Sequence, residues 1–349
     1  MKHVVEGLTT GPKNLLTDID GLTVGNAEDH KALSGVTVIL AESAATAAVH
    51  IAGGAPGTRE TDALAPECLV SATDAIVLSG GSVLGLDAAS GVTAWLGTKN
   101  RGHHVPGVAT RAPIVPAAIL SDLGNGGDKS WGDTPPYAAL GKHAVRSASD
   151  SFALGNAGAG LGATAGALKG GLGSASIVAS SGLAVGALVA ANPVGSVTMP
   201  GTNCFWAAPY EIDNEFGGLG WPRELSGYAT GNPLAQSKLQ ALSGGANTTI
   251  AVVATNADLT VTEAKRVAIM AHDGLARAIR PVHTPFDGDS VFALATGAFS
   301  LESDLDSDRP LQVATIGALA ADTLARAIAR AVFEAHSIGD HNGWATMIQ

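Results

Sequence analysis

The sequence is short of cysteine, aromatic side chains and basic charge, and each shortage excludes a class of protein. Cys68 and Cys204 are the only cysteines in 349 residues and no CxxC spacing occurs, which argues against a disulfide framework or a cysteine zinc site. Lys and Arg number 20 against 31 Asp and Glu, so the formal net charge of −11 argues against a nucleic-acid partner. Because aromatic residues make up 4%, a core must be built from Ala, Val, Leu and Ile.

Long apolar runs are missing as well. Between Gly170 and Tyr210 the chain carries no charge, yet serine, asparagine and proline interrupt it too often for a run of about 20 apolar residues. The N-terminal residues lack the apolar core of a secretory signal. Together with the cysteine usage, these features predict a cytoplasmic protein with no membrane partner.

What is present indicates a folded α/β protein. Hydrophobic residues make up 46% of the chain and charged residues 15%, and the 45 glycines follow no G-X-Y period, so they belong to turns and close packing. Short apolar runs predict strands, and periodic segments predict helices that alternate with them, as in α/β layers. The expected strands are 36–40, 75–78, 177–179, 194–198, 250–254 and 291–294, and the expected helices are 84–96, 262–279 and 313–333. Thr260 and Glu263 have the spacing of a capping box, and the polar segment 222–247 is expected to be an exposed connector.

A glycine-rich stretch, residues 155–163, contains a G-x-G-x-x-A match that could cradle a pyrophosphate. The dinucleotide fingerprint also needs an acidic residue about 20 positions later, and none occurs between Asp150 and Glu211, so tight turns explain these glycines better. Lys169 is the one charged residue in that interval. It either reaches the surface or is held in a site where burial lowers its pKa.

Two acidic clusters could carry chemistry. Asp287 and Asp289 flank a glycine, where they could orient an amine or hydroxyl, bind a metal, or form a solvated turn before a strand. Residues 302–308 resemble half a calcium loop but lack its glycine and its distal glutamate, which favours a solvated loop. No HExxH motif occurs, so neither a metal nor another cofactor is expected.

The segment Asn247-Thr248-Thr249 lies where the polar connector meets an apolar run. It is formally a glycosylation sequon, which is irrelevant without secretion, and it could simply start a strand. Alternatively, the Thr248 hydroxyl attacks the preceding carbonyl and breaks the chain. The released α-amine of Thr248 would then serve as general base for its own hydroxyl.

Eight ordered segments together resemble a known family. They are Leu16–Gly25, Gly53–Asp62, Leu78–Gly91, Pro113–Ala118, Gly158–Ala163, Asn192–Gly195, Asn247–Ile250 and His283–Asp289. The chain resembles the DmpA-type L-aminopeptidase/D-esterase family of self-cleaving amino-terminal-nucleophile hydrolases, which includes the β-aminopeptidases and the nylon-oligomer endo-hydrolase. The resemblance covers most of the chain.

The resemblance implies a fold and a set of site residues. It implies a four-layer αββα sandwich, of the type shared with ornithine acetyltransferases, in which one hydrolase domain is cut into residues 1–247 and 248–349. Thr248 would be the nucleophile of self-cleavage and of hydrolysis, and Asp287 and Asp289 would position its amine and hydroxyl. Asn192 would lie near the oxyanion, where an amide stabilises charge that develops in the transition state.

Two positions depart from the family pattern. Many relatives carry a catalytic lysine directly after an Ala-Gly pair, a position that here holds Ala167, with Lys169 two residues later as its candidate substitute. The nylon-hydrolase branch places a tyrosine beside the acid that corresponds to Asp122, and here that neighbour is Ser121.

The sequence therefore predicts an amide hydrolase that forms an acyl-enzyme on Thr248 and resolves it with water. Its substrates would be small peptides, amino-acid amides or esters, or amide oligomers, and the processed units are expected to form homo-oligomers by analogy with the family. The alternatives are a 6-aminohexanoate-oligomer endo-hydrolase, an acetyltransferase, an uncleaved binding protein and, last, a dinucleotide-dependent enzyme.

Overall fold

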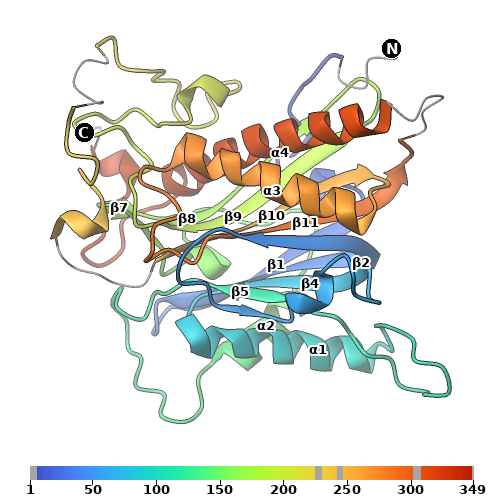
Figure 1. Cartoon of the computed structure of the whole chain (residues 1–349). Coiled ribbons are helices and arrows are strands. Elements are labelled where there is room, and N and C mark those ends of the chain that lie inside the picture. The colour runs from blue at the N-terminus through green and yellow to red at the C-terminus, as the bar shows by residue number, and fades with distance from the viewer. Residues whose placement is uncertain (1–5, 225–229, 242–246, 302–307, 348–349) are drawn as a thin grey trace.

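Helices cover both sides of two layers of strands in the computed structural model, which describes residues 6–224, 230–241, 247–301 and 308–347 (Figure 1). The helices are α1 (Ala88–Thr98), α2 (Tyr137–Arg146), α3 (Val261–Ala278) and α4 (Asp308–Phe333). The longer strands are β1 (Leu22–Asp29), β2 (Ser34–Ile51), β4 (Ala72–Ser79), β8 (Gly171–Val178), β9 (Ala184–Asn192), β10 (Thr248–Ala257) and β11 (Ser290–Phe299). The short ones are β3 (Thr58–Arg59), β5 (Ala117–Ile119), β6 (Thr164–Ala165) and β7 (Leu168–Lys169).

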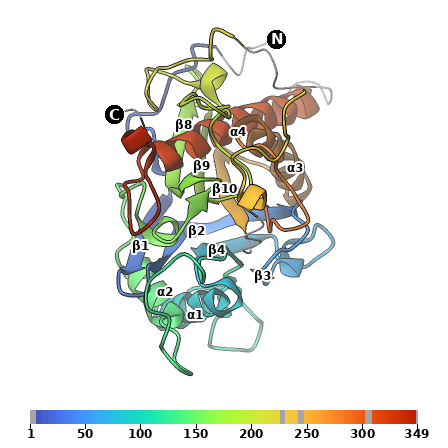
Figure 2. The ribbon, with the colours of Figure 1, turned by 90° about the vertical axis from the view of Figure 1, so that its left-hand side faces the viewer.

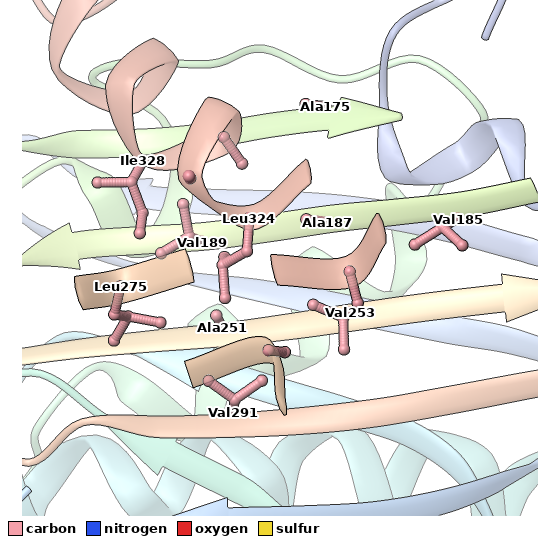
Figure 3. Packing of buried hydrophobic residues seen from close by; sticks show 14 of the residues in the cluster. Ala175, Val185, Ala187, Val189, Ala251, Val253, Leu275, Val291, Leu324 and Ile328 are labelled. Carbon is pink, nitrogen blue, oxygen red and sulfur yellow. The ribbon is translucent and has the colours of Figure 1, made fainter. Parts of the chain in front are cut away.

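The alternation of apolar residues in the strands produces the layers. Along β10, Ile250 and Val252 face the core between the two strand layers, whereas Ala251 and Val253 face α3 and α4. Figure 3 shows the small side chains of β9 and β10 under Leu324 and Ile328 of α4. A third cluster lies between α1, α2 and the strands β1, β2 and β4. The chain therefore forms the predicted αββα sandwich, with a core of mostly aliphatic side chains.

One long strand joins the two strand layers. The first part of β2 pairs antiparallel with β4 and β1, and its last part pairs antiparallel with β11. The register with β4 shifts between Leu40 and Ala45, where the strand passes from one layer to the other. The resulting sheet has the order β3-β5-β4-β2-β11-β10-β9-β8, with β1 paired to β2.

The helix α3 begins as its sequence predicts and packs closely on α4. The Thr260 hydroxyl accepts the Glu263 N–H, and the Glu263 carboxylate accepts the Thr260 N–H at 2.8 Å, so the predicted capping box is confirmed. Gly274 of α3 lies against the carbonyl of Ala321 in α4, where a Cβ would come within 2.2 Å of the oxygen. Small residues thus allow the two helices to approach closely on the sheet.

Most predicted elements are confirmed, but several details differ. Residues 194–198 form only isolated bridges, because Pro193 cannot continue the β9 ladder and the Ser196 hydroxyl bonds the local backbone at Thr198. Residues 84–87 belong to a 3-10 turn, so α1 begins at Ala88. The helix α2 and the strands β1 and β9 were not predicted. The segment 222–247 is exposed only in part, because Ser237 and Asn247 pack against the site and are buried. Among the described residues, none of the helices is long and apolar enough to cross a bilayer.

The capping box yields a stability prediction. Replacing Thr260 by Ala removes the hydroxyl that satisfies the Glu263 N–H, and we expect a loss of about 1 kcal/mol in the free energy of unfolding. Thr262→Ala, two residues into the helix, is the control and should change it by under about 0.5 kcal/mol. Equal effects of the two changes in chemical denaturation would contradict the cap.

Candidate active site

Strand pairing brings the predicted site residues together at one end of the sheet. Because β9 runs antiparallel to β10, the last residue of β9, Asn192, pairs with the first residue of β10, Thr248. Because β11 runs parallel to β10, the loop that enters β11 lies beside the same end, and Asn247 pairs with Asp287 in a parallel bridge. The 3-10 turn Lys238–Ala241, drawn in gold, lies at this end of the molecule (Figures 1 and 2).

The peptide bond before Thr248 is surrounded by polar contacts. The carbonyl oxygen of Asn247 accepts the Gly288 N–H at 3.0 Å and also the hydroxyl of Thr248. Asn247 and Thr248 are 2% and 3% exposed, so bulk water competes little for these bonds. A Cβ on Gly288 would come within 2.7 Å of both Thr248 Oγ1 and the Ala55 carbonyl. A hydroxyl, a carbonyl and a backbone donor thus meet at one bond.

Asp287 is held by three donors. One carboxylate oxygen accepts the Val194 N–H at 3.0 Å, and the other accepts the Thr284 N–H at 3.1 Å and the Thr284 hydroxyl at 2.6 Å. Burial first, and then the neighbouring charge of Asp289, raise the pKa of Asp287. A nearby cation would therefore strongly favour its ionised form.

Asp289 holds the strand that carries Thr248. One carboxylate oxygen accepts the Thr249 N–H at 2.8 Å, and the other lies 3.1 Å from the His283 N and 2.8 Å from His283 Nδ1. The His283 ring packs on His272, whose pKa burial lowers to about 4. In the sequence, His283 stands out only as the first residue of the segment His283–Asp289, and no role was predicted for it. Its place in that motif was the available signal.

Asn192 is fully buried, and its side-chain amide is oriented by bonds at both ends. The amide oxygen accepts the Thr164 N–H at 2.9 Å and a proton of Lys238 Nζ at 3.1 Å. The amide nitrogen donates to the Ser121 carbonyl at 3.0 Å. Lys238, which the sequence analysis did not single out, therefore belongs to this constellation.

Lys169 is buried, so of the two alternatives the surface-reaching one is wrong. Its ammonium donates to the carbonyls of Gly160, Ala163 and Gly170 at 2.8–2.9 Å. Burial has the largest effect on the pKa of Lys169 and lowers it to about 7, although the negative charge of Asp122 acts in the opposite direction. Ala167 is exposed in the turn between β6 and β7. A catalytic role for Lys169 remains a prediction.

The remaining candidates from the sequence are a phosphate-binding loop, Asp122 and a metal site. The glycine-rich stretch 155–163 contains a three-residue 3-10 turn, Gly158–Gly160, and no α-helix follows it, so the helix N-terminus that a pyrophosphate site needs does not form there. Asp122 accepts the Ser34 hydroxyl at 2.7 Å and the Gly81 N–H at 2.8 Å, and burial raises its pKa. Within the described part of the chain, no three His, Cys, Asp or Glu side chains gather as metal ligands. Residues 302–307 of the calcium-like run lie outside the described residues.

The chain matches known proteins along most of its length. A family model described as peptidase family S58 matches residues 14–346. An uncharacterized aminopeptidase of Mycobacterium tuberculosis is 43% identical over 340 residues, which cover 93% of this chain and 95% of that protein. A 6-aminohexanoate-oligomer endohydrolase of Kocuria sp. is 28% identical over 93% of this chain and 87% of its own length. The solved L-aminopeptidase D-Ala-esterase/amidase of Ochrobactrum anthropi, described as a variant of the Ntn hydrolase fold, matches with a TM-score of 0.68 at 22% identity and covers 95% of this chain and 89% of its own.

The buried lysine gives a pH prediction. In the unfolded chain Lys169 has an ordinary pKa near 10.5, so between pH 7 and 10.5 the unfolded state binds a proton that the folded state does not. Stability from this group therefore rises with pH in that window, by at most about 1.4 kcal/mol per pH unit. Lys169→Met removes this rise. Denaturant unfolding of both proteins at pH 7, 8 and 9 checks it, and parallel pH dependences would contradict the lowered pKa of Lys169.

Proposed function

Since the chain belongs to peptidase family S58, we propose that it cleaves itself between Asn247 and Thr248 and then uses Thr248 as the nucleophile of an amide hydrolase. Membership in the family makes it a hydrolase that acts on peptide bonds, of the aminopeptidase or amidase kind. The single observation that carries the finer proposal is the Thr248 hydroxyl on the Asn247 carbonyl, beside the Gly288 N–H.

Self-cleavage would proceed on this geometry in two steps. Thr248 Oγ1 bonds to the Asn247 carbonyl carbon, and the Gly288 N–H stabilises the negative oxygen of the tetrahedral intermediate. The bond from that carbon to the Thr248 nitrogen then breaks, and the nitrogen takes the hydroxyl proton, which leaves an ester. Water hydrolyses the ester to give the Asn247 carboxylate and a free Thr248 α-amine, in fragments 1–247 and 248–349.

Hydrolysis of a substrate would reuse the same atoms. The released α-amine takes the Thr248 hydroxyl proton as the oxygen attacks a substrate carbonyl, and it returns the proton to the leaving amine. Asp289 holds the Thr249 N–H and so positions the start of β10. Asp287 supplies buried negative charge near the new amine, and the Asn192 amide lies beside Thr248 in the strand pair. Water then releases the acyl group.

The substrates we propose are small peptides and amino-acid amides or esters. The mycobacterial relative at 43% identity is described as an aminopeptidase, and this favours that assignment. The second candidate is endo-hydrolysis of 6-aminohexanoate oligomers, which the Kocuria relative at 28% identity supports. Release of aminohexanoate from a linear oligomer, compared with release of nitroaniline from amino-acid nitroanilides, distinguishes the two.

Gly288→Ala tests the proposal. The added Cβ must displace Thr248 Oγ1 or the Ala55 carbonyl, so we expect self-cleavage to slow by at least about 100-fold and amide hydrolysis to be lost with it. Gel electrophoresis after synthesis measures the cleavage, and nitroaniline release measures the activity.

Gly124→Ala is the matched control, because a Cβ on Gly124 meets no atom within 4 Å. This variant should be cleaved and active like the wild type, and far-UV circular dichroism should show both variants folded. A folded Gly288→Ala protein that cleaves itself at the normal rate would overturn the proposed geometry.

A further inference from the structure

His283 donates to the buried carboxylate of Asp289 from the loop that joins α3 to β11. Its backbone N–H and its ring Nδ1 both lie against one oxygen of Asp289, at 3.1 Å and 2.8 Å. The other oxygen accepts the Thr249 N–H at 2.8 Å. Because an ionised carboxylate can only accept hydrogen bonds, Nδ1 carries the ring proton. Asp289 therefore connects the His283 ring to the residue that follows the proposed nucleophile.

The backbone of His283 has a conformation that few side chains adopt. Its φ is 54°, in the left-handed region that glycine and asparagine enter most easily. A strained conformation of this kind persists only where the surrounding contacts fix it, and such residues cluster at functional sites. Here the N–H and the ring of one residue both reach a single oxygen of Asp289, which is 1% exposed. The loop is therefore shaped around this carboxylate.

Two further imidazoles pack in a row with the His283 ring. His272 of α3 contacts it edge to face with the ring centroids 5.0 Å apart, and His50 of β2 contacts His272 in the same way at 4.8 Å. The ring of His272 is itself fixed, because it is buried and its Nε2 donates to the His50 carbonyl at 2.9 Å. Burial lowers the pKa of His272 to about 4 and also lowers the pKa of His50. At neutral pH both rings are therefore uncharged and support His283 by packing alone.

We propose that His283 is a positioning residue for both reactions of Thr248 and that it acts through Asp289. The inference rests on the proposed function and adds a residue to it. The His283 Nδ1–H fixes the carboxylate, the carboxylate fixes the Thr249 N–H, and this bond sets the direction in which β10 presents the Thr248 hydroxyl. In the described part of the chain no hydrogen bond joins His283 to Thr248 itself, so His283 should affect the rate of the chemical step and not substrate binding. A displacement of about 1 Å at a nucleophile can cost about 100-fold in rate.

Two substitutions at His283 separate its side-chain donor from its backbone conformation. Glycine and asparagine both tolerate the left-handed φ, but only asparagine carries a side-chain N–H that can reach the position of Nδ1. We expect His283→Gly to slow self-cleavage at least about 30-fold and, once fully processed, to lower kcat for an amino-acid amide by a similar factor with KM within about twofold. His283→Asn should keep both rates within about threefold of the wild type. Gel electrophoresis after synthesis and initial-rate kinetics measure these values.

Amide hydrogen exchange in the uncleaved chain tests the same connection without any catalysis. In the Thr248→Ala background we expect His283→Gly to raise the exchange rate of the Thr249 N–H at least about tenfold, and His283→Asn to leave it within about threefold. The amide of Val253 is the internal reference, because it lies in the middle of β10 with a paired strand on each side. An equal rise at Val253 would show that the whole sheet is destabilised, and it would overturn the inference.

The outcomes separate this inference from the proposed function. If the wild type cleaves after Asn247 but His283→Gly keeps its rates, or His283→Asn loses as much as His283→Gly, the positioning role is refuted and the proposed function stands. A rise in KM without a fall in kcat refutes it equally, because His283 would then act on substrate binding. A wild-type chain that stays intact and inactive, yet needs the His283 donor to protect the Thr249 N–H, refutes the proposed function and keeps the connection through Asp289.

Discussion

The pairing of β10 with its two neighbours is the constraint on which the site depends. An antiparallel partner on one side and a parallel partner on the other bring the end of β9 and the entry to β11 to the first residue of β10. Asn192, Thr248 and Asp287 are far apart in sequence and meet only through this arrangement. The pairing in turn depends on the alternating aliphatic residues of β10, which bury both faces of the strand between two cores.

Burial then determines how the polar groups at this end behave. Asp287 and Asp289 are each about 1% exposed and are held by backbone and hydroxyl donors, while Lys169 is held by three carbonyls. In such surroundings a charge is costly unless it is paired, and burial lowers the pKa of Lys169 and of Lys238 to about 7. The charge state of each group therefore depends on the donors or acceptors that surround it.

The sequence located the starts of β10 and β11 to within two residues, but it missed β1, β9 and most of β2. Thr248, Asp287 and Asp289 could be noticed because each lies near the start of an apolar run, and the family resemblance supplied their roles. The pairing of β10 and β11 confirms that the two runs are neighbouring strands. Lys238 could not be found this way, because it sits in a polar segment without periodicity and reaches the site through tertiary packing alone. The error at 194–198 has a similar origin, since a short apolar run does not reveal that the ladder stops at Pro193.

The central claim is that the bond between Asn247 and Thr248 is the one that the folded chain breaks. Mass spectrometry of freshly purified, denatured protein tests it most directly. The account predicts two fragments of 247 and 102 residues (349 minus 247), the smaller beginning with Thr248, and one intact chain of 34.7 kDa for Thr248→Ala. A single 34.7 kDa chain in the wild type, or a break at any other bond, would contradict it.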